Sequence, residues 1–148
     1  MTTPTAFVSI QSALITALST TPALAGGRIY TNRLRPISSG SNTGIVVRLD
    51  VAEGAEEVLG SLDWQTSLAV ECYARAATGA DPAAAVDALL SDVWARLGAL
   101  NFTTLDASIS INPKIDWQYD DAETPVVCAV IHLSAQHRTA LVTLQPWS

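Results

Sequence analysis

The clearest pattern in the chain covers residues 63–75, where apolar and polar side chains alternate. A period of two predicts a long strand with one face on a core and one face in water. Shortly after it, Asp81 and Pro82 supply a helix N-cap and a first helical position. Apolar side chains then repeat at helical spacing, at Val86, Leu89, Leu90, Val93 and Leu97. The pattern therefore predicts a half-exposed strand and a helix that ends near Gly98 and packs back on the same sheet.

A second amphipathic helix is predicted near the N-terminus. Thr3 can cap this helix with Pro4 at its first helical position. Four apolar side chains share one stripe of it, namely Phe7, Ile10, Leu14 and Leu18.

Strand character returns between the two helices, at residues 28–32 and 45–51. Residues 35–44 contain mostly Gly, Ser, Asn and Thr with little to bury, so we expect a mobile loop there. Residues 53–61 contain two glycines and three acids, which predicts a hairpin connection before the long strand.

The C-terminal half predicts two more strands. Residues 105–112 alternate, Pro113 implies a bulge, an edge or a tight bend, and the alternation resumes as far as Tyr119. Residues 126–133 are continuously apolar, which predicts a strand covered on both faces. With helices on one face only, the second cover of this strand would have to come from another subunit.

Together these elements predict one α+β domain over residues 1–148. The expected architecture is a single, mostly antiparallel sheet with both helices packed on one face, in the order α-β-β-β-α-β-β. No internal repeat or linker divides the chain, and neither helix–strand unit could bury its apolar face alone.

Composition adds an expectation about partners. Charged residues make up only 15% of the chain, against about 25% in typical soluble domains, so part of the surface is expected to be covered by partners. The formal net charge of −6, with one lysine and scattered arginines, argues against binding nucleic acid through its phosphates.

Cys72 and Cys128 both lie in apolar strand patterns, and we expect buried free thiols in a reducing cytoplasm. A disulfide between neighbouring strands is the alternative. No Lys or Arg precedes Arg28, so the positive region of a signal peptide is missing, and no apolar stretch approaches the ~20 residues of a membrane span.

Motifs for catalysis or cofactor binding are absent from the sequence, so no catalytic, cofactor or metal residue is predicted. No glycine-rich phosphate loop or G-x-S-x-G nucleophile elbow occurs. His132 and His137 lie five residues apart, which in a strand places them on opposite faces and does not favour joint metal binding. We expect one packed and one surface imidazole.

The densest acidic group is Asp116, Asp120, Asp121 and Glu123. We expect it to be a solvated turn. The alternative is a small hydrolase that uses Asp116 and Asp120 with one of the two histidines, which requires a pocket that gathers them.

The tryptophans are candidate anchors. Trp64, Trp94 and Trp117 belong to apolar patterns and are expected in the core or at an interface. Trp147 has no local core to join, so it either contacts a neighbouring chain or belongs to a disordered tail.

Beyond these patterns, element order and a few positions resemble a known family. The matching positions are the N-terminal helix, the Arg28–Arg33 segment with Arg35-Pro36 and the polar loop after it, the strands at 45–51 and 63–70, the helix at 81–97, Ile115-Asp116-Trp117 and His137-Arg138-Thr139. In these features the chain resembles the tail terminator proteins of long-tailed phages, the family that includes the minor tail protein U of lambda-like phages. The resemblance covers nearly the whole chain, and related neck, head–tail joining and tail-completion proteins share much of it.

The resemblance implies a structural protein without enzymatic activity. It implies a hexameric ring that caps the tail tube, stops its polymerisation and offers the surface on which the head docks. The implied partners are further copies of the chain, the tail tube protein and a neck or head-completion protein, with DNA passing through the lumen without specific binding. The implied location is the head-proximal end of the tail in the virion, after assembly in the host cytoplasm.

A heterologous ring needs two different surfaces on each subunit, and we expect them on the helix-free face of the sheet and in the region 109–117. The candidate interface residues are Arg33, Arg35, Ile37, Ser39, Asn42, Ile109, Ile111, Trp117, Arg138 and Trp147.

Overall fold

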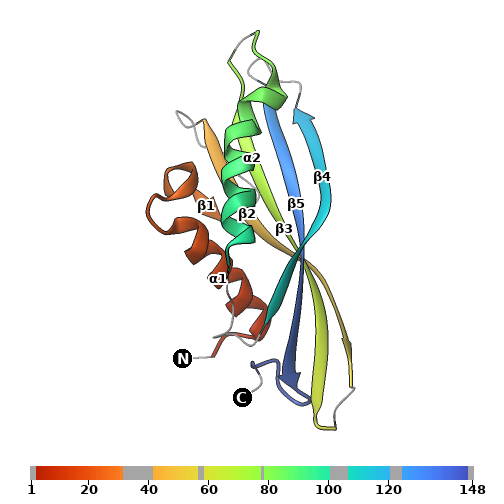
Figure 1. Ribbon diagram of the computed structural model, residues 1–148. Coiled ribbons are helices and arrows are strands. Elements are labelled where there is room, and N and C mark those ends of the chain that lie inside the picture. Colours follow the sequence, from red (N-terminus) through yellow and green to blue (C-terminus); the bar gives the residue numbers. More distant parts are fainter. Residues whose placement is uncertain are drawn as a thin grey trace.

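The computed structural model describes residues 3–31, 42–56, 59–77, 79–100, 107–120 and 125–146 (Figure 1). The helical elements are α1 (Ala6–Ser19), the short 3-10 helix η1 (Leu24–Gly27) and α2 (Pro82–Gly98). The strands are β1 (Ile29–Tyr30), β2 (Thr43–Ala55), β3 (Ser61–Arg75), β4 (Ser108–Asp120) and β5 (Val126–Ala140).

The described strands form one five-stranded mixed sheet in the order β1-β2-β3-β5-β4. β1 pairs parallel to β2, and the other three pairings are antiparallel. The predicted α+β class, with a single sheet and two α-helices, is confirmed at this level.

Both helices pack on the same face of the sheet, α1 beside β2 and α2 over β3 and β5 (Figure 1). Ile10, Leu14 and Leu18 of α1 are buried, as the predicted stripe requires. The five apolar positions predicted for α2 are all buried too, and Asp81 caps this helix by accepting a hydrogen bond from the Ala83 N–H, 3.1 Å away.

The predicted start of α1 is wrong by two residues. Thr5, rather than Thr3, caps the helix and accepts from the Val8 N–H at 3.3 Å. The reason is a tertiary contact: the Ala6 N–H donates to the Leu144 carbonyl at 2.7 Å, and the Gln145 side chain donates to the Thr3 carbonyl. These bonds hold the first residues beside the C-terminal segment, outside the helix.

The expectation that a second subunit must cover the apolar strand β5 is also wrong. On the helix-free face, Cys128 and Val130 are buried within the single chain, together with Val46, Ala69 and Tyr73. Cys72 lies on the helix side, and both cysteines are buried thiols that form no disulfide, as predicted. Burial raises the pKa of Cys72 to about 12, so this thiol stays protonated.

β2 and β3 are longer than the sequence pattern predicts. Residues 53–55 belong to β2 and pair with Asp63, Trp64 and Gln65, whereas the prediction placed them in the connection. The long strands therefore continue beyond both helices (Figure 1). We name this paired extension the arm: residues 53–55 of β2, 61–65 of β3 and 136–140 of β5. The predicted irregularity at Pro113 is present as a register shift between Ile111 and Ile115.

Candidate functional site

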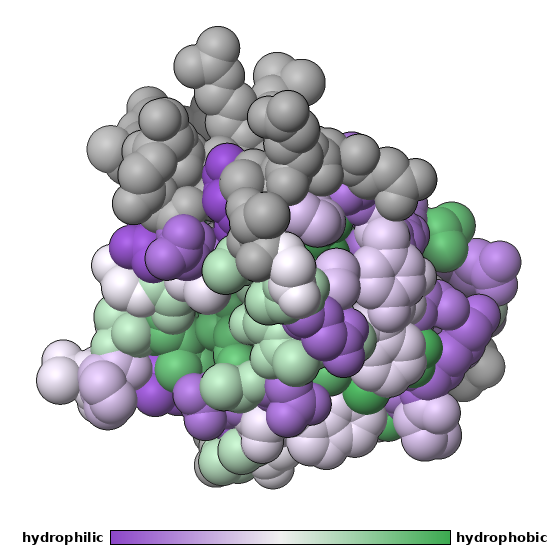
Figure 2. Space-filling view, turned by 90° about the horizontal axis from the view of Figure 1, so that it is seen from above, coloured by the Kyte–Doolittle hydropathy of each residue, from purple (hydrophilic) through white to green (hydrophobic). Residues whose placement is uncertain are grey.

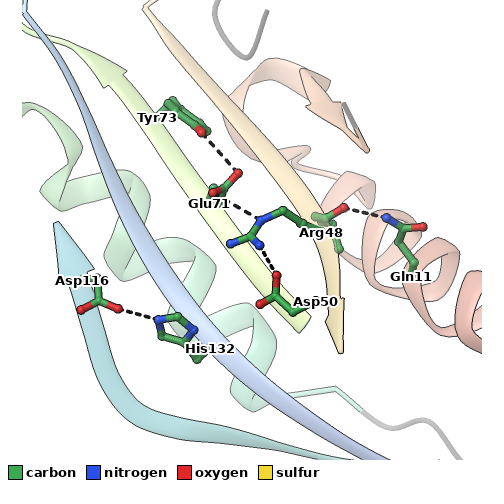
Figure 3. A network of polar contacts seen from close by, with 8 residues as sticks. Gln11, Arg48, Asp50, Glu71, Tyr73, Asp116 and His132 are labelled. Atoms are coloured by element: carbon green, nitrogen blue, oxygen red, sulfur yellow. Dashed lines mark hydrogen bonds and ion pairs between the residues drawn. The ribbon is translucent and has the colours of Figure 1, made fainter. Parts of the chain in front are cut away.

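The centre of the helix-free face carries a charged cluster around a fully buried carboxylate. Glu71 of β3 is the buried acid; its Oε1 accepts from the Tyr73 hydroxyl at 3.2 Å, and its Oε2 lies 3.6 Å from Nε of Arg48 on β2. The same guanidinium donates to Asp50, so one arginine bridges two carboxylates (Figure 3). The ion pair with Arg48, whose side chain is partly exposed, lowers the cost of burying Glu71.

A second polar pair lies on the same face, between β4 and β5. His132 Nε2 and Asp116 Oδ2 are 2.7 Å apart (Figure 3). Asp116 therefore belongs to a strand and has a partner, which corrects the prediction that it lies in a solvated turn. Its neighbours in the acidic group, Asp121 and Glu123, lie outside the described residues.

The histidine–aspartate pair does not extend to a nucleophile on the same strand. Ser134 is two residues beyond His132, and its buried hydroxyl has no hydrogen-bond partner among the described residues. His137 lies on the opposite face, so it cannot join the pair. In the part of the chain that the structure describes, no cluster of His, Cys, Asp and Glu could hold a metal ion.

Toward the arm, an open groove of about 970 Å³ crosses the sheet. Its polar wall includes Glu53, Gln65, Gln136 and the ion pair between Arg138 and Asp63, whose closest N–O distance is 2.6 Å. The hydrogen bond from Arg138 lowers the pKa of Asp63, which keeps this carboxylate ionised. The groove thus presents amides, the carboxylate of Glu53 and a neutralised ion pair, which suits a polar partner.

On the other side of the same strands, an aromatic cluster joins the start of α1 to the arm. The Phe7 ring stands edge-on to the rings of Trp64 and His137, with centroids 5.1 and 5.3 Å away. His137 Nε2 lies 2.7 Å from the Thr66 hydroxyl, and the Trp64 indole N–H donates to the Thr139 hydroxyl at 2.8 Å. His137 is therefore the packed imidazole that the sequence predicted.

We expect the free energy of unfolding to fall as the pH drops below 6.5, with His137 as one cause. Burial lowers the pKa of His137 below its ordinary 6.5. Between the ordinary pKa of the unfolded chain and the lower pKa of the folded chain, His137 binds a proton in the unfolded chain but not in the folded one, so acid favours unfolding. Below the pKa of the folded chain, the loss of stability from His137 is complete. Denaturant titrations across this range should give a shallower pH dependence for His137→Gln than for the wild type. Equal slopes for the two proteins would contradict the prediction.

The structure places the predicted interface residues in different surroundings. Ile109 and Ile111 are partly buried against the core, and Trp117 is 44% exposed on the edge strand β4. Asn42 is exposed just before β2, where its carbonyl accepts from the Arg75 N–H. Arg138 lines the groove. Five candidates lie outside the described residues, namely Arg33, Arg35, Ile37, Ser39 and Trp147.

Sequence patterns missed two groups that organise these surfaces. Glu71 occupied a predicted wet position of the β3 alternation, and only the strand pairing reveals that Arg48 and Tyr73 enclose it. Arg96 showed no signal beyond its place in the last turn of a helix, yet it binds the end of α1. Trp64 is half-buried, whereas Trp94 and Trp117 are exposed rather than in the core.

The surface seen from above mixes apolar side chains with hydrophilic ones over the part that Figure 2 colours. This mixture agrees with the low charge content of the chain. Neither described helix has the length and apolarity needed to span a bilayer. A scan against protein-family models and a search of the curated proteins both find no match to the chain.

Proposed function

We propose that this chain is a structural tail terminator of a long-tailed phage, which caps the tail tube as a hexameric ring and offers the surface for head docking. The proposal combines the family resemblance in element order with the surfaces described above. Its enzymatic alternative is weaker, because the Asp116–His132 pair lacks a bonded nucleophile on its strand.

The observation that carries the proposal is the state of the charges on the helix-free face. Arg48 is paired with Asp50 and Glu71, and Arg138 with Asp63, so carboxylates neutralise both of these arginines; Arg75, at the end of β3 on the same face, has no carboxylate partner among the described residues. With a net charge of −6, such a face would repel DNA weakly and let it slide. A ring whose lumen is lined by this face, in place of the subunit contact that the sequence predicts there, can conduct a genome without retaining it.

Size and shape support the same proposal. A domain of this length has a radius of gyration of about 15 Å, and six such bodies in a ring leave a hole roughly as wide as one subunit, enough for duplex DNA. The arm of β2, β3 and β5 extends past the helices, where it offers a partner a surface that the helix layer does not block (Figure 1).

The test is tail length in a phage that produces the chain. Without the chain, we expect tail tubes of uncontrolled length and no joined heads in electron micrographs, and supplying it in trans should restore both. Tails of normal length that fail to join heads would contradict a terminator and assign the chain to the neck. Normal tails with heads attached would contradict both roles.

A further inference from the structure

Strand β4 presents an aromatic surface that the helix layer leaves uncovered. Alternate side chains of β4 face the helix side, since they are paired with buried core residues of β5. α2 packs mainly over β3 and β5, so these side chains become more exposed toward the end of β4: Trp117 is 44% and Tyr119 57% exposed. We name the set the β4 shelf: Ile109, Ile111, Ile115, Trp117 and Tyr119.

Trp94 of α2 extends the β4 shelf. Arg96 reaches from α2 to the end of α1, and residues two apart on a helix point about 200° apart. Trp94 therefore lies on the flank of α2 that faces away from α1, toward β4, and it is 36% exposed. Exposed Trp and Tyr beside isoleucines are the composition of an interface core rather than of free surface.

The opposite side of the helix layer carries a surface of complementary chemistry. Helix α1 contains no charged residue, and the first charge in the chain is Arg28. Its outer side presents Val8, Ser12 and Ser19, which are exposed (Val8 by 43%), and Ile15, which shares their helical spacing but is half-buried against the core. We name these four residues the α1 outer stripe. A helix whose outer side is in water carries polar or charged residues there; on this side of α1 the polar residues are serine and threonine, so covering it removes no charge from water.

We infer that the β4 shelf of one copy packs on the α1 outer stripe of the next copy. An uncharged stripe suits aromatic rings, because no charge has to lose its water when they meet. The two surfaces lie on opposite sides of the helix layer (Figure 1), so the contact is heterologous and can close into a ring. A fully buried Trp or Tyr side chain removes ~150–250 Å² from water, and Trp94, Trp117 and Tyr119 are 36%, 44% and 57% exposed, so together they have roughly 300 Å² left to bury, a sizeable share of the ~800 Å² per partner in a standard interface. This inference rests on the ring of the proposed function and identifies its subunit contact.

The contact is tested by native mass measurement of three variants. Ser12→Arg places a charge on the α1 outer stripe, and Trp117→Arg places one in the β4 shelf. Ala88→Arg adds the same charge to an exposed position of α2 that adjoins no residue of either surface and is the matched control. We expect the wild type and Ala88→Arg to assemble, and Ser12→Arg and Trp117→Arg to be monomers with circular dichroism spectra unchanged from the wild type. If Trp117→Arg misfolds, Tyr119→Arg takes its place.

Mixing the two interface variants gives the decisive result. Ser12→Arg keeps an intact shelf and Trp117→Arg keeps an intact stripe, so an equimolar mixture should form dimers of one copy of each and nothing larger. A mixture that stays monomeric, or single variants that still assemble, would overturn the inferred contact. A wild type that never assembles would overturn it as well.

These outcomes are separate from those for the proposed function. If the interface variants still form rings and tail length still depends on the chain, the inferred contact is wrong and the terminator role stands. If tail length is normal without the chain, the terminator role is wrong, and the native mass results alone decide the contact.

Discussion

Replacing Arg96 by Met should lower the free energy of unfolding by about 2 kcal/mol. The guanidinium of Arg96 donates to the carbonyl oxygens of Thr20 and Pro22, each 2.9 Å away, and to that of Leu18 at 3.2 Å. The last carbonyls of a helix have no partner within it, and α1 has no basic residue in its own last turn. Hydrogen bonds from a charged donor contribute about 1.5–3 kcal/mol, and the positive charge also stabilises the helix dipole.

Denaturant titration measures this loss, and Arg96→Lys is the matched control. Lysine keeps the positive charge but cannot bind several carbonyls with a planar fork, so we expect an intermediate stability. Met retains much of the buried stem, which limits any packing loss. A change of under about 0.5 kcal/mol for Arg96→Met, typical of ordinary surface positions, would contradict the role of Arg96 in holding the end of α1.

Replacing Trp64 by Ala should lower the free energy of unfolding by about 3 kcal/mol. The indole packs against Phe7, donates to Thr139 and lies so close to Gly54 that a Cβ there would be 2.9 Å from the ring. Removing a large aromatic side chain from such a site costs about 3–5 kcal/mol, and the half-buried position of Trp64 favours the low end.

Trp64→Phe separates packing from hydrogen bonding in the same titration. Phenylalanine keeps a ring against Phe7 but loses the N–H donor to Thr139, so a loss of about 1 kcal/mol is expected. Equal losses for Trp64→Ala and Trp64→Phe would contradict the packing role. A far-UV circular dichroism spectrum unchanged from the wild type for both variants would show that the helices stay folded and that the loss is local to the aromatic cluster.

The elements that local signals specify were predicted well from the sequence. α2 has a cap, a proline at its first position and five periodic apolar residues, and the structure has all of these as predicted. The start of α1 was missed because a bond from Ala6 to Leu144, distant in sequence, decides it. The end of β2 was missed because Gly54 weakens the strand pattern, although the glycine is needed for the approach of Trp64.

The surfaces were less predictable than the fold, because they depend on strand order. The spacing of His132 and His137 correctly placed them on opposite faces. That His132 meets Asp116 follows only from the pairing of β4 with β5, which no local pattern specifies. The same holds for Glu71, which becomes buried only because β2 brings Arg48 beside it.

The arm has a consequence for how the molecule moves. Its strands lie beyond both helices, so their backbone hydrogen bonds have less apolar cover than those of the central sheet (Figure 1). The cluster of Phe7, Trp64 and His137 holds the base of the arm to α1, but the tip beyond it contributes no side chain to the apolar core, and such segments open at a small fraction of the global free energy of unfolding. The tip of the arm can therefore fray and reform while the helix-covered half stays folded, and its amide hydrogens would exchange with solvent before those of the central strands.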